Sequence, residues 1–208
     1  MPQTKIGVLV SGSGSNLQSI IDNINKGNIN GKIVVVISNN KEAYGLERAR
    51  KTNIPAVYIN HKDYEDYEKF NDAIIEELEK YHVELVVLAG YLKILSKKFI
   101  EKFSNKIINV HPSLIPSFCG KGYYGIKVHQ AAIEYGVKIS GATVHFVDEG
   151  ADTGPIIIQE AVRVSPQDTA ETLQQKILKI EHEILPLAIK YYCEGKIEIE
   201  GRKVIIKE

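Results

Sequence analysis

The first half of the chain alternates apolar runs with segments of helical periodicity. Five runs are typical of buried strands: "KIGVLVS", "KIVVVIS", "PAVYI", "ELVVLAG" and "KIINVH". Between the first two runs, apolar residues recur at the spacing of one helix face; they are Leu17, Ile20, Ile21 and Ile24. Helical patterns also cover 44–52 and 64–81. This alternation predicts a doubly wound α/β fold with a mostly parallel sheet, in which ligands bind at the carboxyl ends of the strands.

A different pattern follows Val110. The glycine-rich loop 119–125 precedes a predicted helix that ends at Tyr135, and two further strands follow, "SGATVHFV" and "PIIIQEAVRV". Because the connection between these strands is short, we expect them to pair antiparallel. The second half is therefore predicted to carry antiparallel strands beside a Rossmann-like first half.

The C-terminal region predicts one long helix and a hairpin. Asp168 with Glu171 three residues later is typical of a capping box, which would open a helix over 169–193. Pro186 is expected to bend that helix. The pattern "KIEIEGRKVII" predicts a terminal hairpin that turns at 200–201.

Composition narrows the class of protein. The 208 residues suffice for one domain with a substantial core, and the 26 basic and 26 acidic residues cancel, so no basic excess favours nucleic acid. No apolar run approaches the roughly 20 residues that span a bilayer, and no signal-peptide pattern opens the chain. The two cysteines lack CxxC spacing. We expect a single cytoplasmic domain without nucleic-acid or membrane partners.

The stretch "VSGSGSNL" directly after the first strand is a candidate binding loop. Gly12 and Gly14 match the start of a dinucleotide fingerprint, but Leu17 stands at the third glycine. The second strand ends at 38–40 in "SNN", without the acid that would bind a ribose. These departures disfavour a dinucleotide site.

A single phosphate fits the same loop better. Small residues between a strand and a helix leave backbone N–H groups free, and the helix dipole favours an anion. The hydroxyls of Ser11, Ser13 and Ser15 are further candidate donors. An ordinary tight turn capped by Ser15 or Asn16 is the alternative, and the loop alone leaves both open.

Two polar residues lie at the end of the fifth predicted strand. In "INVHP", Asn109 and His111 are two apart and point to the same face. An amide and an imidazole there can form a donor pair for a developing oxyanion. The acidic loop "VDEGADTGPI" supplies carboxylates, and one beside His111 would favour its protonated form. A structural histidine and a solvated acidic turn are the alternative.

A metal site is disfavoured. His111, His145 and one carboxylate could form a two-histidine, one-carboxylate iron site, but no short ligand spacing supports it. The pair at 182–183, "HE", is not part of an HExxH motif, because Pro186 stands at the second histidine. We expect no metal.

Motifs along nearly the whole chain resemble the phosphoribosylglycinamide formyltransferase family, folate-dependent enzymes of purine biosynthesis. They are "SGSGSNLQSII", "SNNKEAYGLERAR", "VVLAGYLKILS", "NVHPSLIP", "HFVDEGADTGPI" and "EHEILP", in family order. The resemblance implies formyl transfer from 10-formyltetrahydrofolate to the amine of 5-phosphoribosylglycinamide. It implies a phosphate-binding half over about 1–105, a catalytic and folate-binding half over about 106–208, and a monomer or homodimer.

The resemblance also implies roles for individual residues. The family positions that bind the substrate phosphate are matched in this chain by Gly14, Ser15 and Asn16. The catalytic positions are matched by Asn109, His111 and Asp152, with Asn109 and His111 stabilising the oxyanion and Asp152 supporting the imidazole. Glu181 matches an acid near the substrate amine.

The folate site implied by the resemblance departs from the family pattern at two positions. Matching residues that line the folate pocket are Leu92, Lys93, Ile94, Leu95 and Asp148. Tyr67 stands where many members have a basic residue for the folate tail, and Lys93 replaces an arginine, which puts affinity for that tail in question. The glycine-rich loop 119–125 replaces a shorter connection, and its role is open.

Three rival functions share parts of this pattern. Methionyl-tRNA formyltransferases and formyltetrahydrofolate hydrolases resemble the same catalytic core, but each normally carries an additional domain for which 208 residues leave no room. Neutral charge also disfavours tRNA. A non-catalytic binding module would lack one of the three catalytic residues, and all are present.

Overall fold

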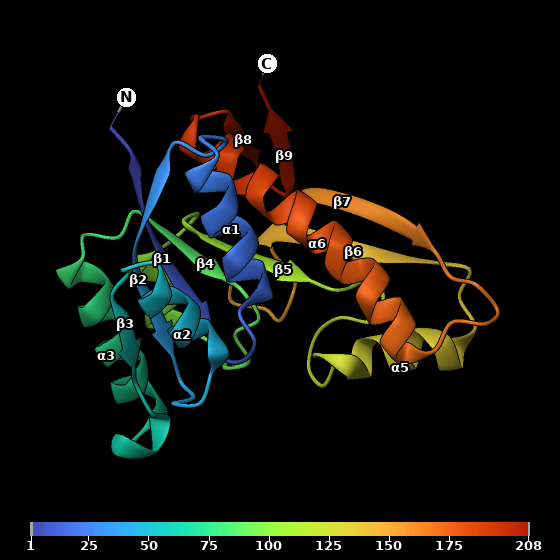
Figure 1. Ribbon diagram of the computed structural model, residues 1–208, viewed down its shortest axis with the longest axis horizontal. Helices are drawn as coiled ribbons and strands as arrows, with labels where there is room; N and C mark the ends of the chain where they lie inside the picture. Colours follow the sequence, from blue (N-terminus) through green and yellow to red (C-terminus); the bar gives the residue numbers. More distant parts are fainter. Residues whose placement is uncertain (1, 208) are drawn as a thin grey trace. The chain divides into compact units, whose positions relative to one another are not determined.

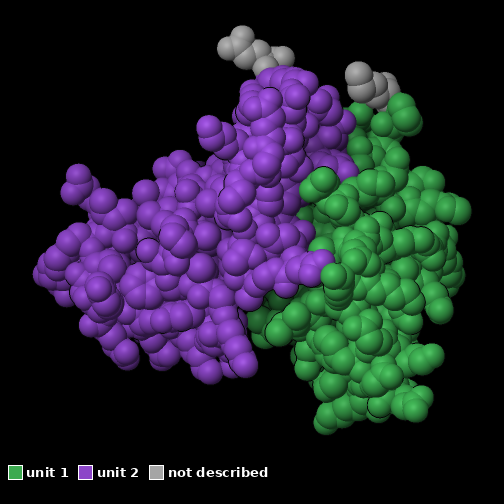
Figure 2. Space-filling model, turned by 180° about the vertical axis from the view of Figure 1, so that it is seen from behind, with its two compact units in different colours: residues 1–108 green, residues 109–208 purple. Residues whose placement is uncertain are grey.

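The computed structural model describes residues 2–207, which form two compact units that divide between residues 108 and 109 (Figure 2). Each unit is described by itself. A single formyltransferase domain spanning both units stays a prediction.

Unit 1 is built on parallel strands in the order β3-β2-β1-β4, with β5 next to β4 (Figure 1). The strands are β1 (Thr4–Val10), β2 (Gly31–Ser38), β3 (Ala56–Tyr58), β4 (Leu85–Leu88) and β5 (Ile107–His111). All four residues of β4 and the last five of β1 are buried, as expected for strands covered on both faces. All five predicted strands are confirmed.

The helices of unit 1 follow the predicted periodicity, with two additions. They are α1 (Ser15–Asn25), α2 (Tyr44–Lys51), η1 (His61–Asp63), α3 (Tyr67–Lys80) and α4 (Lys97–Lys102). The sequence did not predict α4, because six residues are too few to show a helical period. Its start is nevertheless marked by Ser96, whose hydroxyl accepts from the N–H of Phe99 at 3.2 Å.

Unit 2 pairs its strands in the order β6-β7-β9-β8. Its elements are α5 (Ile126–Tyr135), β6 (Ile139–Phe146), β7 (Ile156–Arg163), α6 (Ala170–Cys193), β8 (Ile197–Glu200) and β9 (Lys203–Ile206). The predicted antiparallel pairs β6/β7 and β8/β9 are confirmed. Helix α6 packs along β6 and β7 (Figure 1).

Two details of the C-terminal prediction were wrong. The capping box of α6 is formed by Thr169 and Thr172, because the Thr172 hydroxyl reaches back to the N–H of Thr169 in place of a glutamate. Asp168 instead accepts from Lys176 at 2.6 Å. The hairpin turns at 201–202, one residue later than predicted, where Gly201 has a φ of 61°.

Candidate active site

A cluster of polar side chains lies in unit 2, which begins with the last three residues of β5, 109–111. Asn109 and His111 come from β5, His145 from β6, and Asp152 from the following loop. Asn109 Nδ2 is 3.1 Å from His145 Nε2, and His111 Nδ1 is 3.5 Å from Asp152 Oδ2. His145 Nε2 lies 3.7 Å from Asp152 Oδ1. The three residues predicted to be catalytic are thus brought together, around a second histidine.

The sequence suggested His145 only as a candidate metal ligand and did not predict its position beside Asn109. His145 Nδ1 is 2.7 Å from the carbonyl oxygen of Phe146, which can only accept, so Nδ1 carries the hydrogen. In the neutral ring Nε2 then accepts from the Asn109 amide. This pair fixes the orientation of the amide and leaves its second N–H free to donate. The only signal in the sequence was one polar residue in the apolar strand "ATVHFV".

His111 is 5% exposed, and both of its ring nitrogens face protein oxygens. Nε2 lies 2.9 Å from the carbonyl oxygen of Phe118, and Nδ1 faces Asp152. Burial lowers the pKa of His111 below its ordinary value and outweighs the raising effect of the Asp152 carboxylate. The Asp152 carboxylate thus favours the protonated ring, as expected, although burial has the larger effect on the pKa of His111.

Asp152 is held in its ionised form. Burial acts to raise the pKa of Asp152, but the neighbouring imidazoles of His145 and His111 and the N–H of Gly120 together lower it below the ordinary value. Gly120 N donates to Asp152 Oδ2 at 2.8 Å. Asp152 has a φ of 59°, a left-handed conformation that is strained for a residue with a Cβ. The loop therefore aims this carboxylate at both histidines.

The loop around Asp152 is shaped by its own polar and glycine residues. Asp148 Oδ1 accepts from Thr153 Oγ1 at 2.5 Å and from Gly150 N at 3.1 Å. A Cβ on Gly154 would lie 1.8 Å from the Phe146 oxygen, so only glycine fits. Asp148 thus organises the loop, and its predicted contact with folate stays a prediction. Glu181 is buried on α6, and its predicted contact with the amine also stays untested.

The candidate phosphate loop lies in unit 1 at the start of α1. Gly14 is the N-cap residue, with a φ of 68° and no side-chain cap for the helix within the described chain. A Cβ on Gly14 would lie 2.6 Å from the Cα of Gly45 in α2, so close approach as well as backbone conformation requires glycine. A turn capped by Ser15 or Asn16 is therefore not what forms here. The uncapped N-terminus suits an anion.

Neighbouring side chains brace this loop. Arg48 of α2 donates from Nε to the Ser13 oxygen at 2.9 Å and from Nη1 to Gln18 Oε1 at 3.0 Å. Ser11 was a candidate hydroxyl donor for a ligand. Its hydroxyl instead donates to Asn39 Oδ1 at 2.6 Å and accepts from Leu92 N at 2.9 Å, so it holds the segment after β4.

The segment 92–95 of unit 1 exposes two large apolar side chains. Leu92 is 60% exposed and Ile94 is 75% exposed, whereas Leu95 is buried in the unit's core. Tyr67 donates its hydroxyl to the carbonyl oxygen of Ile94 at 2.7 Å. Tyr67 and the predicted folate segment are thus in contact, and the apolar surface of Leu92 and Ile94 is available to a ligand.

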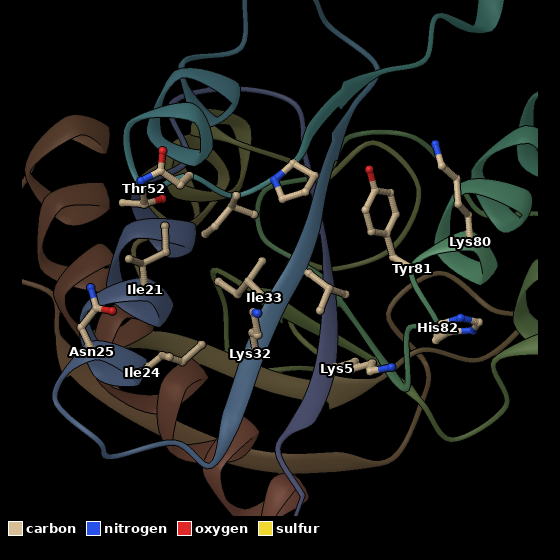
Figure 3. A pocket seen from close by; sticks show the side chains of 14 residues that line it. Lys5, Ile21, Ile24, Asn25, Lys32, Ile33, Thr52, Lys80, Tyr81 and His82 are labelled. Atoms are coloured by element: carbon tan, nitrogen blue, oxygen red, sulfur yellow. The ribbon is translucent and has the colours of Figure 1, made fainter.

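A cavity of about 570 Å³ lies elsewhere in unit 1, at the amino ends of the strands (Figure 3). Helices α1, α2 and α3 all end there, at Asn25, Lys51 and Lys80. Three lysines line the cavity: Lys5, Lys32 and Lys80. Their positive charge is favourable near the carboxyl ends of helices, where the helix dipole is negative. None of the predicted site residues lines this cavity.

Within residues 2–207, no group of three His, Cys, Asp or Glu side chains could hold a metal ion. Across the same residues, no helix is long and apolar enough to cross a membrane.

The chain is similar to known formyltransferases over nearly its whole length. The pattern of the family described as "Formyl transferase" matches residues 4–189. The phosphoribosylglycinamide formyltransferase of Haemophilus influenzae is 43% identical over 196 residues, which cover 94% of this chain and 90% of that protein. The structure of glycinamide ribonucleotide transformylase 1 from Symbiobacterium toebii matches with a TM-score of 0.94 and 46% identity, over 99% of this chain and 95% of that one.

A longer relative contains the same region as one part. The trifunctional purine biosynthetic protein adenosine-3 of Chironomus tentans is 43% identical over 204 residues, or 97% of this chain. The chain spans only 14% of that protein's length.

Proposed function

Because this chain belongs to the formyl transferase family, and within it to the phosphoribosylglycinamide formyltransferases, we propose that it transfers a formyl group from 10-formyltetrahydrofolate to the primary amine of 5-phosphoribosylglycinamide. The observation that carries the proposal is the cluster of Asn109, His111, His145 and Asp152, in which an amide donor and a histidine–carboxylate pair lie together. We expect the reaction to need no metal.

The reaction needs one proton removed and one supplied. The amine nitrogen bonds to the formyl carbon, and the electron pair of the C=O bond moves to oxygen. The carbonyl then re-forms as the bond between the formyl carbon and the folate nitrogen breaks. The amine loses one proton and the folate nitrogen gains one, so the proton count is unchanged. The protein must therefore stabilise the transient oxyanion and carry one proton.

The cluster supplies both requirements. The free N–H of the Asn109 amide donates to the oxyanion, and its orientation is held by His145. When His111 takes up a proton, its positive charge lies beside Asp152 and stabilises the negative intermediate. Asp152 supports the imidazolium and assists the proton's passage to the folate nitrogen.

We propose substrate-binding roles for residues of each unit separately. The backbone N–H groups of Gly14, Ser15 and Asn16 bind the phosphate, supported by the first turn of α1. Glu181 of unit 2 binds an amine group. Folate packs on the residues of 92–95, Tyr67 and Asp148, with the exposed Leu92 and Ile94 giving apolar contact. A cytoplasmic monomer or homodimer is part of the same proposal.

The test is formyl transfer by the purified protein, followed by the change in folate absorbance with and without 5-phosphoribosylglycinamide. We expect the change only when the ribonucleotide is present. Equal deformylation in its absence would identify a formyltetrahydrofolate hydrolase, the second candidate, and would refute the proposed acceptor.

A further inference from the structure

The cavity of about 570 Å³ in unit 1 has a positively charged lining that the proposed reaction does not use (Figure 3). Of the fourteen described residues that line it, three are lysines, one is a histidine and none is acidic. The chain as a whole has 26 basic and 26 acidic residues, so it carries no general excess of positive charge. The lining of this cavity therefore favours an anion.

Two of the lysines, Lys5 of β1 and Lys32 of β2, are the strand lysines of the cavity. They are register partners in the parallel pair, so their side chains leave the same face of the sheet. Within the part of the chain that the structure describes, neither ammonium pairs with a carboxylate. Like charges directly opposite one another on neighbouring strands are destabilising. An anion bound between the strand lysines would relieve this repulsion.

The helices that end at the cavity do not account for the strand lysines. Each helix has a basic residue of its own at its carboxyl end, where the dipole is negative. These residues are Lys26 after α1, Lys51 in α2 and Lys80 in α3. Lys80 is also paired with Glu77, at 3.2 Å between Nζ and Oε1. The charges of the strand lysines are additional to these.

The cavity lies along an uncovered edge of the sheet. β3 pairs only with 36–38 of β2, so no strand of the described chain lies beside 31–35 on that side. Lysines protect such edges against pairing with other chains. This role explains Lys32 but not Lys5, because β1 lies between β2 and β4. Outward-facing backbone N–H groups of the uncovered stretch are further donors for an anion.

Most of the remaining lining is apolar. Ile21 and Ile24 reach the cavity from α1, Ile33 from β2 and Ile54 from the segment before β3. Figure 3 shows the two isoleucines of α1 on one side of β2 and Tyr81 on the other. Ile24 and Ile54 are only half-buried, so each can contact a ligand. A cavity of this volume, with apolar walls and a few charged groups, is typical of a site for a small organic molecule.

We propose that this cavity binds a small amphipathic carboxylate, at a site separate from the residues assigned to formyl transfer. The two carboxylate oxygens each accept from one strand lysine, and the apolar body of the ligand packs against the isoleucines. The proposed phosphate loop lies at the opposite end of α1, whose 11 residues span about 16 Å. Binding at the cavity needs neither folate nor the ribonucleotide.

Calorimetric titration with octanoate measures this binding. Octanoate combines an apolar chain with a carboxylate, 1-octanol retains the chain without the charge, and acetate retains the charge without the chain. We expect saturable binding of octanoate, binding of 1-octanol about tenfold weaker, and no binding of acetate. No saturable binding of octanoate, or equal affinity for octanoate and 1-octanol, would overturn the proposal.

Lys5→Gln combined with Lys32→Gln tests the role of the strand lysines. Loss of two ion pairs with the carboxylate should raise the Kd for octanoate about tenfold and leave the Kd for 1-octanol unchanged. The matched control combines Lys62→Gln with Lys69→Gln, two exposed lysines of unit 1 that do not line the cavity. We expect this control to retain the Kd for octanoate. An equal rise in both double variants would indicate attraction to the protein's overall charge and would refute the site.

Methyl NMR locates the bound ligand. Isoleucine methyl groups are labelled with ¹³C, assigned by single isoleucine-to-valine substitutions, and recorded with and without octanoate. We expect the signals of Ile24, Ile33 and Ile54 to shift, and that of Ile184 in unit 2 to stay unchanged. Ile94, exposed on the predicted folate segment, is the internal comparison. A shift at Ile94 without shifts at the cavity isoleucines would place octanoate on the folate surface and overturn the proposal.

The outcome for this site is independent of the outcome for the proposed function. If octanoate binds at the cavity but no formyl reaches the ribonucleotide, the carboxylate site stands and the proposed function fails. If formyl transfer proceeds but octanoate does not bind at the cavity, the function stands and the carboxylate site is refuted.

Discussion

The two histidines of the cluster differ in the groups that their ring nitrogens face. His145 holds its hydrogen on Nδ1 toward Phe146, and His111 Nε2 lies beside the carbonyl oxygen of Phe118. His145 Nε2 then accepts from Asn109, and His111 Nδ1 faces the Asp152 carboxylate. Residue types and spacing do not specify a tautomer. This part of the site could be established only from the structure.

Asn109→Ala tests the proposed oxyanion donor. Loss of the amide removes one hydrogen bond to the intermediate, so we expect kcat to fall on the order of 100-fold or more, with an unchanged thermal unfolding midpoint. Single-turnover formyl transfer is the measurement. Asn25→Ala, on the surface of α1, is the control and should retain full activity. Full activity in Asn109→Ala would remove this residue from the mechanism.

His129 predicts a pH-dependent contribution to stability. It is 2% exposed on α5, and burial, with a smaller effect of the His111 charge, lowers the pKa of His129 to about 4. In the unfolded chain this histidine has its ordinary pKa of about 6.5. At a pH between about 4 and 6.5, unfolding is therefore accompanied by uptake of a proton at His129. The free energy of unfolding should therefore decrease as the pH falls from about 6.5 toward 4.

Urea unfolding of His129→Gln at about pH 7 and pH 4.5 measures this contribution. Because glutamine does not titrate, the difference in unfolding free energy between the two pH values should be smaller than in the unaltered protein by on the order of 2 kcal/mol. An identical difference in both proteins would show that His129 does not titrate with a lowered pKa.

At the scale of elements, patterns in the sequence predicted the strands and the longer helices but not the details of their ends. Buried strands and amphipathic helices have periods that a single sequence shows, as Leu17, Ile20 and Ile21 do for α1. The cap of α6 was misassigned because Thr172 performs the role expected of a glutamate three residues from the cap. The loop motif marks Gly14 as a candidate binding residue. The close contact with Gly45 of α2, which requires glycine at this position, depends on tertiary structure and cannot be read from the motif.

Arg48 links α2 to the loop that begins α1, and Arg48→Ala tests that link. Loss of the bonds to Ser13 and Gln18 should loosen the phosphate loop, so we expect KM for the ribonucleotide to rise about tenfold and KM for folate to stay unchanged. Arg48→Lys retains the charge but not the two directed bonds, so we expect an intermediate effect.

Arg50→Ala is the control for the change at Arg48. Arg50 lies on the same helix and pairs on the surface with Glu47. Its loss should leave both KM values unchanged. An equal rise in KM from Arg50→Ala and Arg48→Ala would indicate a general effect of charge on α2 rather than bracing of the loop.

At the scale of the whole molecule, the predicted fold class is confirmed, and family membership rests on similarity along nearly the entire chain. The residues assigned to phosphate and folate were chosen by position in family motifs, and their roles are proposals that substrate measurements must test. The sequence could place Asn109 and His111 on one strand face, since that follows from a period of two. It could not show that Asp152 reaches both histidines, because this depends on the left-handed turn of a loop.

The most direct test of the central claim follows the formyl carbon itself. In a single turnover with excess protein, 10-formyltetrahydrofolate labelled with ¹³C in the formyl group is mixed with 5-phosphoribosylglycinamide, and mass spectrometry locates the label. We predict that the label appears in the ribonucleotide as its formamide, and that Asp152→Asn slows its appearance about 100-fold or more. Label found in free formate, with the ribonucleotide unlabelled, would contradict formyl transfer to this acceptor.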